Sequence, residues 1–199
     1  MNFLEWILMI IIGYIIGSIP FSYLIPKWLG RIDIRQHGSG NTGTTNVVRT
    51  LGLRIGIVAF LGDFIKGIIP TVIGFVLFST LGGIVGGSFA ILGHCYSIWL
   101  KFKGGKGIAT SAGVLVILMP LILIILLTIQ FIIIFATKIM SLASISSAIL
   151  LPILTALLYS NDELLYFSFF LAIFVIFKHK DNIKRLVKGE ENKLSIKKK

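Results

Sequence analysis

The chain has 199 residues, of which 56% are hydrophobic and only 14% are charged. Soluble domains usually carry about 25% charged residues, so this composition excludes an ordinary soluble protein and indicates an integral membrane protein. The net charge of +11 gathers in short segments between apolar runs and forms no recognition module, so we expect no nucleic-acid partner. A single cysteine, Cys95, excludes an internal disulfide.

Six apolar stretches follow one another, most of them near the roughly 20 residues that a membrane span requires. The first, at 3–25, has Glu5 near its start and no small-residue cleavage site after it, so we interpret it as a retained span rather than a signal peptide. No repeat or linker divides the chain, so residues 1–199 are predicted to form one membrane domain with a basic cytoplasmic tail at 178–199. The other stretches lie at 55–78, 81–100, 108–137, 139–159 and 164–177.

Lysine and arginine collect in three places: between the first two spans, at 101–106, and in the tail. Because positively charged loops stay on the cytoplasmic side, all three are expected inside. An amino terminus outside and a tail inside require an odd number of crossings, so one of the six stretches must be split. The stretch at 108–137 is long for one span and contains Pro120, a residue that breaks or kinks a helix.

A split at Pro120 gives a short helix near 108–119, about 18 Å long, and a longer helix after it. It also puts Lys138 inside and the acidic segment 161–163 outside. The predicted fold is therefore an all-α polytopic membrane helix bundle of seven transmembrane helices, with its amino terminus outside and its carboxy terminus cytoplasmic. The competing count is five, with two stretches merged or re-entrant.

A polar, glycine-rich segment at 38–49 stands out from these apolar runs. Its glycines let backbone N–H groups approach an anion, its hydroxyls and amides can donate, and an arginine can grip phosphate in two places. The same residue types are common in turns, but the segment supplies more donors than a connection needs. We therefore interpret it as an anion-binding segment, with Ser39, Asn41, Asn46 and Arg49 as its donors.

A second glycine-rich segment follows Gly93-His94 and includes the 104–107 turn, Gly-Gly-Lys-Gly. Lys106 is followed by Gly107, so the Walker pattern is absent and a nucleotide site is disfavoured. A glycine turn that opens into a helix offers N–H groups and the positive end of the helix dipole to phosphate. Lysines that merely anchor the chain at lipid headgroups would not need these glycines. His94 is a candidate general base beside the turn.

The segment from His179 to Glu190 follows the last span and is predicted to continue it as a helix. His179 and Asn182 then share a face, and Arg185 extends the polar stripe. A basic tail that reaches anionic lipid is the alternative, and it is our interpretation of Lys197 to Lys199. Inside the second span, Asp63 and Lys66 form either a buried pair that locks the helix or part of the chemistry.

Four motifs together resemble those of the bacterial acyl-phosphate:glycerol-3-phosphate acyltransferase family, integral membrane enzymes that begin phospholipid synthesis. They are G-S-x-N-x-G-x-T-N-x-x-R at 38–49, D-x-x-K-G at 63–67, G-H with F-K-G-G-K-G-x-A-T at 93–110, and H-x-x-N-I-x-R-L-x-x-G-x-E at 179–191. Their order and separation make the match specific, and it covers nearly the whole chain. The sequence departs from the family at Thr44, where alanine is usual, and at Ser97, where a proline often stands.

The resemblance implies transfer of a fatty acyl group from acyl phosphate to the first hydroxyl of glycerol 3-phosphate, which gives lysophosphatidic acid and phosphate. It implies a multi-pass protein of the bacterial inner membrane, with its active site facing the cytoplasm and membrane lipids as further partners. We expect no metal and no cofactor. By resemblance, Ser39, Arg49, Lys106 and His94 are assigned catalytic roles, and Asn41, Asn46, Gly104, Gly105, Gly107, His179, Asn182 and Arg185 are assigned to substrate binding.

Two other classes of function, a transporter and a lipid-binding protein, fit the sequence less well. An anion channel or carrier would be expected to show inverted repeats and a site near the membrane midplane, whereas the polar motifs here lie at one face and no repeat is visible. A non-catalytic lipid-binding protein would explain the basic tail but not the two glycine-rich segments.

Overall fold

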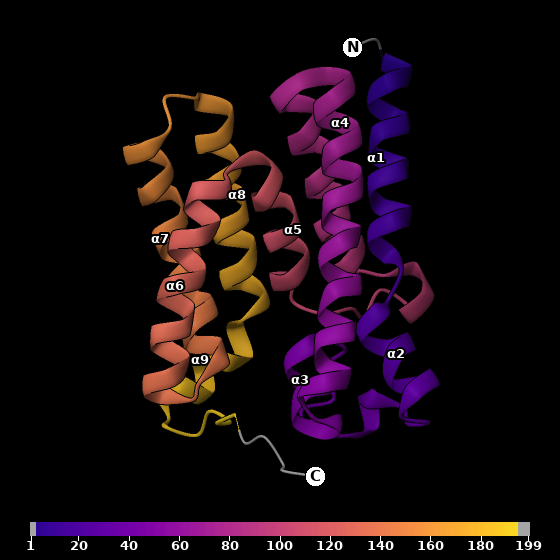
Figure 1. Ribbon diagram of the computed structural model, residues 1–199, viewed down its shortest axis with the longest axis vertical. Coiled ribbons are helices and arrows are strands. Elements are labelled where there is room, and N and C mark those ends of the chain that lie inside the picture. The colour runs from indigo at the N-terminus through magenta and orange to yellow at the C-terminus, as the bar shows by residue number, and fades with distance from the viewer. Residues whose placement is uncertain (1–2, 195–199) are drawn as a thin grey trace. The chain divides into compact units, whose positions relative to one another are not determined.

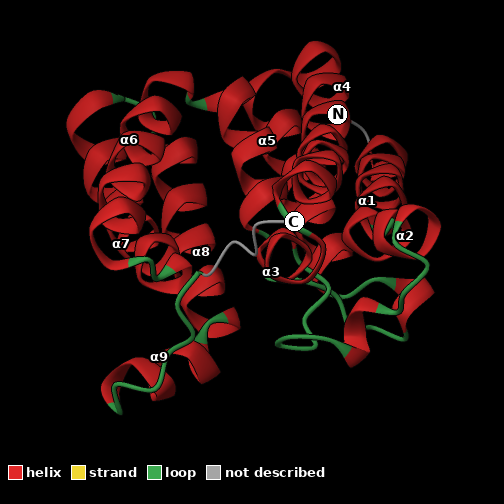
Figure 2. Ribbon diagram, turned by 60° about the horizontal axis from the view of Figure 1, so that its bottom comes forward, coloured by secondary structure: helices red, strands yellow, loops and turns green. Residues whose placement is uncertain are grey.

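The computed structural model describes residues 3–194, which are helical and contain no strand (Figure 2). The all-α class is thereby confirmed, while Lys197 to Lys199 lie outside the described residues. The described chain divides into two compact units that meet in sequence between Leu118 and Met119. The single membrane domain stays a prediction. The first unit contains α1 (Phe3–Ser18), α2 (Phe21–Leu29), the 3-10 helix η1 (Ile34–Gln36), α3 (Thr44–Leu51), α4 (Leu53–Cys95), the 3-10 helix η2 (Ile98–Leu100) and α5 (Ile108–Leu118).

Four helical stretches are long and apolar enough to cross a membrane: 3–29, 53–100, 120–137 and 140–158. Large apolar side chains are widely exposed on them, including Phe135 at 86% and Val76 at 74%. Such surfaces suit lipid rather than water, because lipid imposes no cost on exposed apolar groups. The structure thus supports the predicted integral membrane protein.

The first predicted span is broken near its carboxyl end. α1 ends at Ser18 and α2 starts at Phe21, so the helix is interrupted at Ile19 and Pro20. Proline has no amide hydrogen to continue the helical ladder, which leaves carbonyls of the preceding turn without their usual partner. The carbonyl of Ile16, four residues before Pro20, accepts the N–H of Ile19 at 3.2 Å. Within the break, the carbonyl of Ile19 accepts a hydrogen bond from Nζ of Lys66 at 2.6 Å.

The long helix α4 consists of two arms joined at Phe78 and Ser79, both of which have non-helical backbone angles. This break confirms the predicted separation of the second and third spans. The arms approach so closely that a Cβ atom added at Gly74 would collide with the backbone of Gly82. In Figure 1, α1 runs beside α4. There too small residues allow the contact, because a Cβ atom at Gly17 would collide with Ala90.

The second arm of α4 ends at Cys95, five residues before the predicted end of the third span at Leu100. Its last carbonyls find partners outside the helix, which a helix end requires. Gly104 donates its backbone N–H to the carbonyl of Cys95, and Gly105 donates to that of His94, both at 3.2 Å. The 104–107 turn therefore caps the carboxyl end of α4.

The segment between α2 and α4 is fixed by a small apolar core. Ile34 and Val47 are fully buried together with Ala59 of α4. Tyr23 of α2 and Leu51 of α3 are among the partly buried side chains packed around them. This core holds η1 and α3, and with them the 38–49 segment, against the start of α4.

The second unit contains α6 (Pro120–Thr137), α7 (Met140–Leu158), α8 (Asp162–Lys178) and α9 (Lys180–Val187). Because α5 ends at Leu118 and α6 begins at Pro120, the predicted split of the 108–137 stretch is confirmed. The segment after the last span is helical, as predicted, but it forms a separate helix, α9, and not a continuation of α8. His179 separates α8 from α9, and its ring Nδ1 lies 2.8 Å from the carbonyl of Val175, so the side chain turns back onto α8.

The close contact between the two arms of α4 can be tested with Gly74→Val. Valine would force the backbone of the second arm away, and overpacking of this kind costs about 1–3 kcal/mol or more. We expect a lower Tm for thermal unfolding of the purified protein in detergent. Val76→Leu, on the exposed face of the same arm, is the matched control and should leave Tm unchanged. Equal Tm values for Gly74→Val and the parent would contradict the packing.

Candidate functional site

The 38–49 segment is organised around the side chain of Asn46, which is only 2% exposed. Its Oδ1 accepts the backbone N–H of Ser39 at 2.9 Å, and Gly38 must lack a Cβ atom because one would collide with that oxygen. Gly38 and Gly40 both have positive φ, a conformation that glycine adopts without strain. The Asn46 Nδ2 amide donates to three carbonyls, those of Ile34, His37 and Asn41.

These contacts give Asn46 a framework role that sequence reasoning did not assign to it. The sequence predicts that Asn46 binds substrate, but the backbone of residues 34–41 already occupies its side-chain amide. Ser39 is exposed at the tip of the loop, while Asn41 and Arg49 are half-buried. Asn46 and Arg49 both lie on α3, so the asparagine fixes the loop that carries Ser39 relative to the helix that carries Arg49.

The 104–107 turn lies directly over the end of α4. A Cβ atom at Gly104 would collide with the carbonyl of His94, and one at Gly105 would collide with the His94 imidazole. Gly107 has a φ of 86°, which again favours glycine. The three glycines are therefore required by close packing and backbone shape. Lys106, half-buried between them, precedes the amino terminus of α5, where helix N–H groups are available to an anion.

The two glycine-rich segments meet in the first unit. A Cβ atom added at Gly105 would lie 3.2 Å from the carbonyl oxygen of Thr42. The structure thus brings the 38–49 segment, the 104–107 turn and His94 together at one end of α4. The two segments that meet carry Arg49 and Lys106 and have backbone N–H groups near glycines, and both kinds of donor suit phosphate.

The predicted pair of Asp63 and Lys66 lies in the first arm of α4. Lys66 Nζ is 2.8 Å from Asp63 Oδ1, and both side chains are buried. The hydroxyl of Ser22, from α2, donates to Oδ2 of Asp63. His94 Nδ1 lies 3.4 Å from Oδ1. A buried charge is tolerated when it is paired and hydrogen-bonded, so the cluster satisfies Asp63 from α2 and from both arms of α4.

In the second unit, Glu191 binds the side chains of the last motif. Its Oε1 accepts from Asn182 Nδ2 at 2.7 Å and from the hydroxyl of Ser141 at 2.9 Å, and its Oε2 accepts from Arg185 Nε at 2.7 Å. Burial alone raises the pKa of Glu191, but the hydrogen bonds from Asn182, Arg185 and Ser141 outweigh it, and the pKa lies below its usual value.

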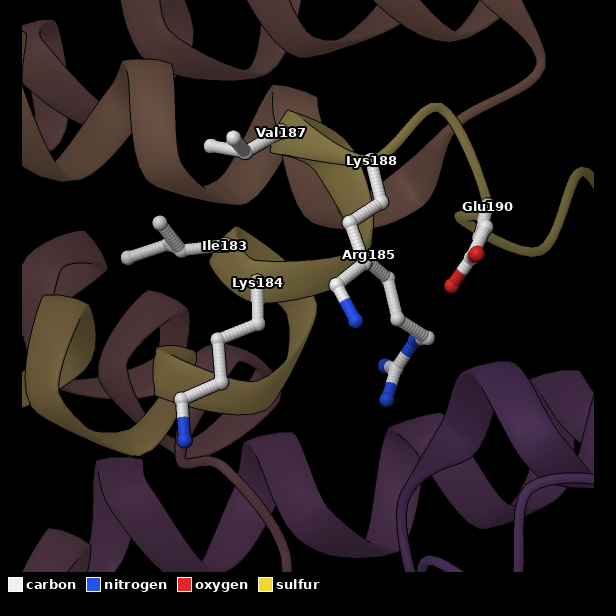
Figure 3. Close-up of a pocket in the computed structure, with 6 residues that line it drawn as sticks. All are labelled: Ile183, Lys184, Arg185, Val187, Lys188 and Glu190. Atoms are coloured by element: carbon white, nitrogen blue, oxygen red, sulfur yellow. The ribbon is translucent and has the colours of Figure 1, made fainter.

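A hollow of about 370 Å³ lies on the surface of α9 (Figure 3). In that view the apolar side chains of Ile183 and Val187 point to one side, while Lys184 and Arg185 point to another. The hollow is open and basic, and of the predicted site residues only Arg185 lines it. The full lining is Ile183, Lys184, Arg185, Val187, Lys188 and Glu190.

Comparisons with known proteins agree with this arrangement of motifs. Residues 7–189 match the family described as glycerol-3-phosphate acyltransferase. Relatives of that name from Thermoanaerobacter pseudethanolicus and Bacillus subtilis (strain 168) are each 42% identical, over 191 and 187 residues. These alignments cover 96% and 94% of this chain and 96% of each relative. The chain belongs to the glycerol-3-phosphate acyltransferase family.

Solved structures show the same relationship. PlsY (YgiH), described as an integral membrane glycerol 3-phosphate acyltransferase, has crystal structures in a glycerol 3-phosphate form and a lysophosphatidic acid form. They are 33% identical to this chain and cover 96% of it, with TM-scores of 0.90 and 0.89. The protein is therefore an integral membrane acyltransferase of phospholipid synthesis, as the motifs predicted.

Three residues that hold the polar clusters of this glycerol-3-phosphate acyltransferase together were not among the predicted site residues: Ser22, Ser141 and Glu191. Glu191 stood in the last motif, so the sequence contained a signal for it. Ser22 and Ser141 are single serines next to or within apolar helices, and nothing in the sequence distinguishes them from other serines. Their contacts arise from segments 41 and 50 residues away.

Glu191→Gln tests the hydrogen-bonded carboxylate of this acyltransferase. The amide cannot accept from Asn182, Ser141 and Arg185 together, so unfolding should become easier by about 1–3 kcal/mol near neutral pH. Because the folded-state pKa is lowered, the carboxylate stabilises the fold above its unfolded pKa, and this contribution is lost as pH falls. The difference in Tm between parent and variant should therefore shrink between about pH 5 and pH 3.

The matched control for this experiment is Glu190→Gln, because Glu190 is exposed and adjacent. It should leave both Tm and its pH dependence close to those of the parent. A Glu191→Gln variant that unfolds at the parent temperature near neutral pH would show that the three hydrogen bonds contribute nothing to stability.

Proposed function

We propose that this acyltransferase moves a fatty acyl group from acyl phosphate to the first hydroxyl of glycerol 3-phosphate, the first step of phospholipid synthesis. The observation that supports this most directly is the contact of two glycine-rich segments at the carboxyl end of α4, where Gly105 lies against His94 and Thr42. Arg49 belongs to one of these segments and Lys106 to the other. Both substrates are phosphates, and this region offers backbone N–H groups and cations to bind them. The glycerol 3-phosphate and lysophosphatidic acid forms of PlsY are consistent with this substrate and product.

The proposed reaction needs positioning more than a reactive protein group. Acyl phosphate is already activated, so the substrate hydroxyl can attack the acyl carbonyl carbon without a covalent acyl-enzyme. The new ester C–O bond forms, the bond between the acyl carbon and the phosphate oxygen breaks, and inorganic phosphate leaves. We propose that the hydroxyl proton passes to a substrate phosphate oxygen, so that no residue is an obligatory base.

The residues of the first unit divide between the two phosphates in this proposal. Ser39, Arg49 and Lys106 bind glycerol 3-phosphate, whereas the 104–107 turn and Asn41 hold acyl phosphate. Lys106 or neighbouring N–H groups also stabilise the charge that develops on the acyl carbonyl oxygen. His179, Asn182 and Arg185 stay predicted substrate-binding residues, although Arg185 Nε already binds Glu191.

Purified protein mixed with acyl phosphate and labelled glycerol 3-phosphate tests this function, and failure to form lysophosphatidic acid would overturn it. Arg49→Ala tests the assigned site. Loss of a hydrogen bond to a charged group costs about 1.5–3 kcal/mol, so the apparent KM for glycerol 3-phosphate should rise about tenfold to a hundredfold, or activity should be lost. Arg54→Ala, an exposed arginine just beyond α3, should retain the parent KM. An unchanged KM in Arg49→Ala would remove the 38–49 segment from the site.

We also propose seven crossings, made by α1, the two arms of α4, α5, α6, α7 and α8, with the active site facing the cytoplasm of a bacterial inner membrane. Single cysteines at exposed loop positions test this orientation in a Cys95→Ala background. Ser160→Cys, between α7 and α8, should react with an impermeant thiol reagent added outside whole cells. Lys138→Cys, between α6 and α7, should react only after the membrane is opened, and the reverse pattern would contradict the orientation.

A further inference from the structure

Asp63 lies at the centre of a buried polar cluster in the first unit. Its side chain is 1% exposed, and its partners Lys66, Ser22 and His94 are also buried. Lys66 neutralises the carboxylate at 2.8 Å, and Ser22 donates to its second oxygen. A buried carboxylate needs hydrogen bonds besides its counter-ion, and Lys66 and Ser22 already supply one partner to each oxygen. The third neighbour of Asp63, His94, lies on the second arm of α4.

The partner on the second arm is His94, which lies between Asp63 and the 104–107 turn. Its Nδ1 is 3.4 Å from Asp63 Oδ1. Its Nε2 faces the turn, because a Cβ atom at Gly105 would collide with that nitrogen. The carbonyl of His94 also accepts the backbone N–H of Gly105 at 3.2 Å. His94 therefore supports Gly105 with both its ring and its backbone.

At 3.4 Å the contact between His94 Nδ1 and Asp63 is long for a hydrogen bond. A carboxylate only accepts hydrogen bonds, so it attracts Nδ1 only when that nitrogen carries a proton, and any role of Asp63 in holding His94 requires a protonated Nδ1. The partner of one ring nitrogen decides which nitrogen of the imidazole is protonated. Lys66 compensates the charge of Asp63, so a neutral imidazole is sufficient.

We propose that Asp63 is a positioning residue for acyl transfer, which holds His94 through Nδ1 so that His94 supports the 104–107 turn against acyl phosphate. This inference rests on the proposed function, in which that turn binds acyl phosphate. Asp63 itself touches no substrate, and its effect passes through His94. Ser39 and Arg49, which are assigned to glycerol 3-phosphate, lie on the 38–49 segment and not on the turn that His94 supports.

Two double variants separate this role from that of the ion pair. One variant combines Asp63→Leu with Lys66→Met, and the other combines Asp63→Asn with Lys66→Met. Both remove the two charges together, so neither leaves a buried charge unpaired. The asparagine oxygen can still accept the Nδ1 proton of His94, whereas leucine cannot. In the leucine variant we expect the KM for acyl phosphate to rise about tenfold, the effect of one lost hydrogen bond, with little change in the KM for glycerol 3-phosphate.

The asparagine variant should restore the KM for acyl phosphate to near the parent value. Thr71→Val is the matched control, because Thr71 is a fully buried polar residue of α4 that bonds only within its own helix at Gly67. It should leave both KM values unchanged. An equal rise in the two double variants, a rise in neither, or a fall in kcat alone would overturn the proposal.

If the leucine variant does not fold, NMR spectroscopy of the parent protein tests whether Asp63 holds His94 through Nδ1. The ¹⁵N chemical shifts of the imidazole of His94 in the parent protein, assigned with His94→Gln, should show a protonated Nδ1 near neutral pH. An unprotonated Nδ1 would overturn the proposal. Parent protein that forms no lysophosphatidic acid would instead overturn the proposed function, and the two failures are therefore distinguishable.

Discussion

The carboxyl end of α4 is the point on which the site depends. A membrane helix that ends leaves its last carbonyls without partners, and lipid supplies none. Here the amides of Gly104 and Gly105 donate to the carbonyls of Cys95 and His94, so one set of bonds both closes the helix and fixes the 104–107 turn. A side chain on either glycine would separate the two segments. The shape of the turn is therefore coupled to the integrity of the transmembrane helix.

Sequence reasoning predicted the features that have a local cause. Pro120 interrupts the 108–137 stretch because proline cannot continue a helical ladder, and that split could be predicted from one residue. The end of α4 at Cys95 could not be predicted in this way, because it depends on the amide of Gly104, nine residues further along the chain. The break at His179 was missed for a similar reason, since its ring turns back to Val175 instead of following the helix.

The site shows a second limit of pattern reasoning. In each polar motif, residues proposed to bind substrate stand beside residues that hold the backbone in place, and both kinds are polar. The Asn46 amide bonds to three carbonyls and one N–H between residues 34 and 41, so only the folded loop reveals its structural role. Glu191 does the same for Asn182 and Arg185. The order and spacing of the motifs identified the family, but they did not show which polar residues hold the backbone and which are left to bind substrate.

The shortness of α5 bears on how the proposed acyl-phosphate donor would reach the site. Its 11 residues make a helix about 16 Å long, roughly half the thickness of a hydrocarbon core. A helix of this length cannot reach both membrane surfaces. If its recessed end is the one that follows the 104–107 turn, the headgroup of an amphiphile would meet the turn at the depth where it resides, and its acyl chain would stay in the bilayer. Only the small, water-soluble acceptor would then have to travel inward.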